Sequence, residues 1–182
     1  MAVKTISQAM ERNLKSEVSI RLATQRDLDR IFSIIDAEAS RSGAVDRVSK
    51  ETLTKWISIC NSYVAEDPNG AIVGHRAVLT VNSEWAELRS AVVNDSYRGN
   101  GVGYKLAEAL LDGFVKNNPN IKYIISVKNE ASNGRGILVA LGFEKMERNE
   151  GLDKMLSIPN EDRWELFALD AEKYRLKSSA RS

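Results

Sequence analysis

Residues 92–106 read Val-Val-Asn-Asp-Ser-Tyr-Arg-Gly-Asn-Gly-Val-Gly-Tyr-Lys-Leu, which predicts a strand end, a glycine-rich turn and the start of a helix. Three alternate glycines, Gly99, Gly101 and Gly103, have no Cβ, so the backbone N–H groups of the turn can come close to a ligand. The helix start adds unpaired donors and the positive end of its dipole. The turn therefore predicts a site for phosphate or pyrophosphate, with Arg98 placing a positive charge at its mouth.

The residues after the turn predict an amphipathic helix that packs on a sheet. Charged residues fall mostly on one side, and apolar residues recur at helical spacing on the other. The apolar positions are Val102, Leu106, Leu110, Leu111 and Phe114.

Three phosphate-binding motifs compete for this turn. A P-loop needs Gly-Lys-Ser/Thr, but here Gly103 is followed by Tyr104. A dinucleotide-binding turn reads G-x-G-x-x-G early in a βαβ unit, whereas this turn reads G-x-G-x-G in mid-chain. The third motif is Arg-x-x-Gly-x-Gly, met by Arg98, Gly101 and Gly103, which closely resembles the pyrophosphate loop of the GNAT superfamily of N-acetyltransferases. A tight turn with surplus glycines is the alternative without a ligand.

Composition excludes several classes of protein. The chain has 182 residues, enough for one domain with a core, and a net charge of +1, which gives no hint of a nucleic-acid partner. No apolar run reaches the ~20 residues that span a bilayer. One cysteine, Cys60, excludes an internal disulfide and suits a reducing compartment, and it falls on an apolar helix stripe. We therefore expect a cytoplasmic protein without a metal site or a membrane partner.

The rest of the chain predicts a regular order of elements. Thr24 and Asp27 form a capping box before the first helix, and Ser49 begins the second. We expect strands near residues 18–22, 63–66, 71–81, 85–93, 121–127 and 164–169, with a further strand that follows Gly142-Phe143. We expect one helix after Thr24 with its apolar stripe up to Ile35, a second from Ser49, and others at 102–116 and 133–141. Residues 148–162 are not assigned. The expected organisation is an arm (1–16), one domain (17–170) and a basic tail (171–182) that frays after Tyr174.

This order and a second motif strengthen the resemblance. Strand, two helices, three antiparallel strands, helix, strand, helix and two strands is similar to the GNAT layout, and Leu141-Gly142-Phe143 resembles the Leu-Gly-Phe that ends its last helix. The resemblance implies a mixed α/β fold of six to seven mostly antiparallel strands with helices on both faces. It also implies that the fourth and fifth strands splay apart and that acetyl-CoA lies between them.

The resemblance also implies the coenzyme contacts. The backbone of Val92 and Val93 would bind the pantetheine arm. Asn129 and Asn133 lie on either side of Ala131, which occupies the family's asparagine position. The pyrophosphate would be held by backbone N–H groups of Arg98, Gly99, Asn100, Gly101, Val102 and Gly103.

The chemistry implied is direct attack of an amine on the thioester in a ternary complex, which needs a base, an oxyanion donor and an acid for the thiolate. Strand alternation places Trp85, Glu87, Arg89, Ala91 and Val93 on one face. Glu87 is the first candidate for the base, acting directly or through water. Glu84 at the strand start is the second, and His75 is the third. An exposed Glu87–Arg89 ion pair is the alternative without catalysis.

The family's usual acid is absent, because Leu138 stands at the tyrosine position and neither Tyr104 nor Tyr123 matches it. Asp95 replaces the usual proline after the fourth strand. Either the thiolate leaves without a dedicated side-chain acid, or the protein is a weak or non-catalytic member of the family.

The segment 86–90, Ala-Glu-Leu-Arg-Ser, resembles the fourth strand of the branch that acetylates amino acids, where Arg89 would hold a carboxylate. The sequence thus predicts an acetyl-CoA-dependent N-acetyltransferase acting on a primary amine of a small molecule such as an amino acid. The alternatives are a protein lysine or N-terminal acetyltransferase, a non-catalytic acyl-CoA-binding regulatory module and a nucleotide-binding protein. Homodimers are common in this kind of fold.

Overall fold

The computed structural model describes residues 17–42, 45–59, 61–129, 134–156 and 164–180. Seven strands form one mixed sheet in the order β1-β2-β3-β4-β5-β7-β6. Neighbouring strands are antiparallel except β4 and β5, which are parallel. The strands are β1 Ser19–Leu22, β2 Ser62–Glu66, β3 Ile72–Thr80, β4 Trp85–Val93, β5 Tyr123–Asn129, β6 Glu144–Met146 and β7 Trp164–Asp170.

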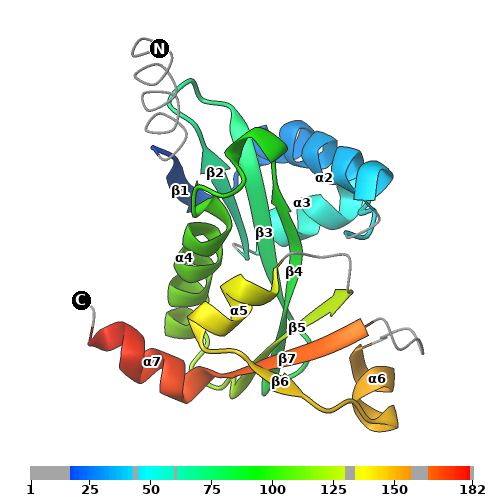
Figure 1. The fold of residues 1–182 in the computed structure, drawn as a ribbon, viewed down its shortest axis with the longest axis vertical. Helices are drawn as coiled ribbons and strands as arrows, with labels where there is room; N and C mark the ends of the chain where they lie inside the picture. The colour runs from blue at the N-terminus through cyan, green and yellow to red at the C-terminus, as the bar shows by residue number, and fades with distance from the viewer. Residues whose placement is uncertain (1–16, 43–44, 60, 130–133, 157–163, 181–182) are drawn as a thin grey trace, which may run out of the picture.

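Helices cover both faces of the sheet, as predicted (Figure 1). We call the side under α2 and α3 the α2 face, and the side under α4, α5 and α7 the α4 face. The helix α6 packs on the β5–β7–β6 half of the sheet through Leu152 and Leu156. In the described ranges the helices are α2 Leu28–Ser42, α3 Lys50–Ser58, α4 Val102–Asn117, α5 Arg135–Leu141, α6 Glu150–Leu156 and α7 Ala171–Ser179, with 3-10 turns η1 Gln25–Asp27 and η2 Asp95–Tyr97.

The two parallel strands separate after a short paired stretch. Pairing of β4 with β5 runs only from Trp85 opposite Tyr123 to Leu88 opposite Ser126. Beyond this point β4 continues along β3, and β5 continues along β7 to Asn129. We call this divergence, lined by residues 89–93 of β4 and 127–129 of β5, the fork. The fork confirms the predicted splay between the fourth and fifth strands.

A bulge in β4 corrects one expectation. The β3–β4 register shifts so that Ser90 and Ala91 together lie opposite Arg76, and Ser90 has a φ of 54°. One extra residue reverses the side-chain alternation beyond it. Val93 therefore packs on the α4 face against the start of α4. The prediction that Val93 shares a face with Glu87 was wrong for this reason.

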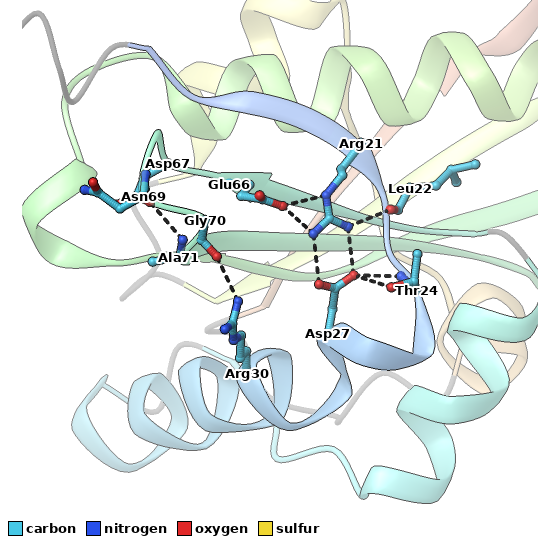
Figure 2. Close-up of polar contacts among 10 residues, drawn as sticks. All are labelled: Arg21, Leu22, Thr24, Asp27, Arg30, Glu66, Asp67, Asn69, Gly70 and Ala71. Carbon is cyan, nitrogen blue, oxygen red and sulfur yellow. Dashed lines mark hydrogen bonds and ion pairs between the residues drawn. The ribbon is translucent and has the colours of Figure 1, made fainter.

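The start of the domain is fixed by a partly buried ion-pair network, shown in Figure 2. Arg21 donates to both oxygens of Asp27, at 2.8 and 2.9 Å, and pairs with Glu66 of β2. The backbone N–H and the hydroxyl of Thr24 also donate to Asp27. The Arg21 guanidinium and Thr24 hold the pKa of Asp27 at about 2 against the opposing effect of burial. This network ties β1, β2 and the start of the first helix together, and it confirms the predicted capping box.

The C-terminal part departs from the expectation of a frayed tail. Helix α7 continues to Ser179, and Tyr174 is buried with its hydroxyl donating to Asp112 of α4 at 2.9 Å. Arg175 donates to the backbone oxygens of Asn118 and Ile121 between α4 and β5. These bonds satisfy carbonyl groups at the end of α4 and hold the helix in place. Part of the unassigned segment 148–162 is α6, and residues 157–163 lie outside the described ranges.

Candidate coenzyme and acceptor site

The glycine turn presents open backbone at the start of α4. Gly99 and Gly101 both have a φ of +76°, a conformation that favours glycine, and a Cβ added at either would meet no atom within 4 Å. Gly101 caps α4 without a side-chain hydrogen bond, and the first turn of α4 contains no acidic residue. The turn thus combines open N–H donors, the positive end of a 16-residue helix and free space, which fits an anionic group.

The loop before the turn is held by its own side chains. Asn94 accepts from the backbone N–H of Ser96 at 3.1 Å, and the Tyr97 hydroxyl donates to Asp67 in the β2–β3 turn at 2.7 Å. The Asn100 amide donates to the backbone oxygens of Tyr97 and Arg98, at 3.3 and 3.2 Å. These contacts fix the loop before any ligand binds.

Each guanidinium nitrogen of Arg98 contacts a protein group. Its Nε donates to the backbone oxygen of Val93 at 2.9 Å, and its terminal nitrogens pair with Glu38 of α2 at 2.7 Å and with Asp95 at 2.9 Å. Arg41 also pairs with Glu38, at 2.6 Å. The arginine therefore joins α2 to the glycine turn, in addition to bringing positive charge to its mouth.

Glu87 and Arg89 meet on the α2 face where the fork begins. Glu87 is only 7% exposed, and both Nε and Nη2 of Arg89 bond to its Oε2, at 2.9 and 2.8 Å. Burial raises the pKa of Glu87, the charge of Asp46 adds to the effect, and Arg89 opposes it. A carboxylate with a raised pKa is a stronger proton acceptor. The Arg89 side chain is 38% exposed, so part of this side chain faces solvent.

The other two candidate bases are placed less favourably for proton transfer. Glu84 precedes β4 at the end away from the fork, is half exposed and pairs with Lys122. His75 is fully buried on β3, where it bonds to Ser62 Oγ through Nε2 at 2.7 Å and to Ser90 Oγ through Nδ1 at 3.1 Å. Burial lowers the pKa of His75 to about 4.

The position of the family's usual tyrosine acid is taken by Leu138, and Tyr104 and Tyr123 are engaged elsewhere. Leu138 is 2% exposed in the core between α4, α5 and the sheet. The Tyr104 hydroxyl donates to Glu108 on the same helix at 3.1 Å, and Tyr123 stacks on Trp85 with ring centroids 4.7 Å apart.

The remaining predicted site residues are located only in part. Val92 pairs with His75 of β3, and Asn129 ends β5 opposite Trp164. Asn133 lies outside the described residues, as do Ala131 and Cys60. Across the described ranges, no group of three or more His, Cys, Asp or Glu side chains could hold a metal ion. None of the described helices is both long and apolar enough to cross a membrane.

A family comparison agrees with this geometry. The model of the Acetyltransferase (GNAT) family matches residues 28–143, which include the glycine turn, the fork and the Leu-Gly-Phe motif. The chain belongs to the GNAT acetyltransferase family. It is thus a transferase of acetyl groups, and the predicted fold and family are confirmed. No curated protein matches the chain.

Solved structures share the GNAT fold at low identity. Rv2747 from Mycobacterium tuberculosis, in complex with CoA and NLQ, is 20% identical with a TM-score of 0.68, over 84% of this chain and 98% of that one. N-acetylglutamate synthase from Neisseria gonorrhoeae, with coenzyme A and N-acetyl-glutamate, is also 20% identical with a TM-score of 0.68. It is matched over 85% of this chain and only 35% of its own. Ribosomal-protein-alanine N-acetyltransferase from Brucella melitensis is 21% identical with a TM-score of 0.61, over 82% and 96% of the two chains.

Proposed function

We propose that this GNAT protein transfers an acetyl group from acetyl-CoA to the primary amine of a small molecule such as an amino acid. The observation that carries the proposal is the Glu87–Arg89 pair on the α2 face at the fork. It places a buried carboxylate beside a partly exposed guanidinium, and these two groups match the amine and the carboxylate of an amino acid. Two structural neighbours are bound to CoA, and one of these also holds N-acetyl-glutamate, which supports the proposal.

The α4 face supplies what the coenzyme needs. The open turn at Gly99 and Gly101 suits the pyrophosphate. The N–H of Asn94 donates to Val73 of β3 at 2.8 Å, and because N–H groups alternate along a strand, the N–H of Val93 faces away from β3. That direction leads into the fork, where an extended pantetheine arm would bind as an added strand. The contacts proposed at Val92, Asn129 and Asn133 remain predictions.

In this mechanism the amine nitrogen bonds to the acetyl carbon, the C–S bond breaks, and coenzyme A leaves as a thiolate that takes its proton from water, since Leu138 stands at the position of the usual acid. Glu87 accepts a proton from the amine, directly or through water, which leaves the nitrogen lone pair free to attack. Arg89 orients the substrate through its carboxylate. Thioesters are reactive by themselves, so the site mainly positions and deprotonates.

The test is a screen of amines for thiol release from acetyl-CoA, with amino acids compared with the corresponding amines that lack the carboxylate. We expect transfer to amino acids, and we expect Arg89→Met to raise KM for them without changing KM for the simple amines. The matched control is Arg26→Met, an exposed arginine in η1, which should leave both unchanged. Transfer only to peptide or protein amines would reject the small-molecule acceptor and favour a protein acetyltransferase.

The apolar surroundings of Leu138 favour one other function, a non-catalytic acyl-CoA-binding regulatory module. Such a module would bind acetyl-CoA and release no thiol with any amine. The same screen separates the two, provided that binding is measured alongside turnover.

A further inference from the structure

Ser90 occupies a backbone conformation that serine rarely adopts. Its φ of 54° is the only positive φ at a non-glycine residue in the described ranges. The residue sits in the β4 bulge, opposite Arg76, at the fork. Conformations of this kind persist only where surrounding contacts impose them, and they cluster at functional sites.

The side chain of Ser90 belongs to a hydrogen-bonded chain of three buried or partly buried side chains. Ser90 Oγ lies 3.1 Å from His75 Nδ1, and His75 Nε2 lies 2.7 Å from Ser62 Oγ. The imidazole is fully buried and Ser62 is 1% exposed, so neither moves easily. Both residues belong to the paired strands β2 and β3, which makes them a rigid anchor for the bulge. The chain draws the Ser90 side chain towards the α2 face.

The bulge determines which backbone groups of β4 face the fork. Without the extra residue the alternation of β4 would continue unbroken, and the N–H of Val93 would point towards β3 instead of into the fork. With it, Val92 pairs with His75 and the N–H of Val93 is directed away from β3. The direction of the donors in the fork therefore depends on the conformation at Ser90.

We propose that the Ser62–His75–Ser90 chain is a positioning device that holds the β4 bulge so that backbone N–H donors of the fork meet the thioester carbonyl. This inference rests on the proposed use of acetyl-CoA. Ser90 and His75 are positioning residues, since they act through the backbone of β4. A donor aimed at the carbonyl stabilises the oxyanion that forms on attack, and loss of one such donor lowers kcat by roughly 100-fold or more.

The test is isotope-edited infrared spectroscopy of bound acetyl-CoA labelled with ¹³C at the carbonyl, which needs no acceptor. Hydrogen bonding should move the carbonyl band of the wild-type complex below that of free acetyl-CoA. Ser90→Ala deletes the hydroxyl and keeps the unfavourable φ, so we expect it to lose this shift. Ser90→Gly also deletes the hydroxyl but adopts the conformation freely, so it should keep most of the shift. Ser83→Ala, at an exposed position in the turn between β3 and β4 and outside the chain, is the matched control and should keep it too.

Turnover gives a second readout once an acceptor is known. Ser90→Ala should lower kcat about 10-fold or more, in line with the effect of misplaced catalytic groups, with KM for acetyl-CoA nearly unchanged. Equal behaviour of Ser90→Ala and Ser90→Gly, or an unchanged band in Ser90→Ala, would overturn the positioning role. Failure of the wild-type protein to bind acetyl-CoA would overturn the proposed function, and this inference with it.

Discussion

Arg76 lies on β3 with its charge buried, and replacing it should stabilise the protein. It is 6% exposed, and its Nε has no hydrogen-bond partner among the described residues. Burial lowers its pKa from 12.5 to about 10. Since one pKa unit corresponds to 1.36 kcal/mol, burial disfavours the charged form by about 3 kcal/mol.

The perturbation is Arg76→Met, which keeps a long apolar side chain and removes the charge. Replacing buried charges by apolar groups of similar volume is often stabilising, and we expect a gain of about 2 kcal/mol after some loss of packing. For a chain of this size the gain corresponds to a rise in Tm of roughly 4–8 °C.

Urea denaturation and thermal melting monitored by circular dichroism measure the effect directly. Arg26→Met is the matched control, because Arg26 is exposed and the same change there should stay within about 0.5 kcal/mol. An equal or lower Tm for Arg76→Met would refute the reasoning. It would mean that the guanidinium has a partner in the folded protein, since removing a partnered buried charge destabilises.

Three further predictions concern other parts of the molecule. Asp27 has a folded pKa of about 2 against an ordinary 3.8, so its contribution of about 2 kcal/mol is present above pH 3.8 and is lost as the pH falls through 2. Asp27→Asn should therefore lower urea stability at pH 7 by about that amount and match the wild type near pH 2; a constant difference at all pH values would contradict this. The pKa of Glu87 is raised by burial, so kcat/KM should begin to fall, as the pH decreases, above the range of an ordinary carboxyl group. Glu87→Gln should be slower and lack that acid limb, and an unchanged profile would exclude Glu87 as the base. A Cβ at Gly113 would lie 2.3 Å from the Tyr63 hydroxyl, so Gly113→Ala should cost about 1–3 kcal/mol in thermal melts. Tyr63→Phe should relieve part of that cost, and an additive double variant would argue against the clash.

Local sequence signals predicted much of the fold and brought some candidate site residues together. The bounds of β4, Trp85–Val93, match the prediction, because alternation and the flanking turns are both encoded locally. Helix α4 follows directly from the glycine turn and the apolar spacing after it. The meeting of Glu87 and Arg89 also follows from their spacing of two in a strand.

The features that could not be predicted depend on distant partners. The bulge at Ser90 arises from the register of β4 against β3, and a serine at positive φ has no local sequence signal. The basic tail after Tyr174 predicts fraying, whereas the structure has helix α7 there. It is held through Tyr174 and Arg175, whose partners lie about 60 residues earlier in the chain. The role of Arg98 in joining α2 to the glycine turn has the same origin.

The most direct test of the central claim is thermal melting with increasing acetyl-CoA. Binding at 100 times Kd should stabilise the wild-type protein by about 2.7 kcal/mol. Gly101→Glu places a side chain and a negative charge in the open turn and should abolish the stabilisation. Gly70→Glu is the matched control, since Gly70 has a similar φ of +78° in the β2–β3 turn, and it should keep the stabilisation. No stabilisation of the wild type, or an equal response to ATP or NAD, would contradict the assignment of the turn and the fork to acetyl-CoA.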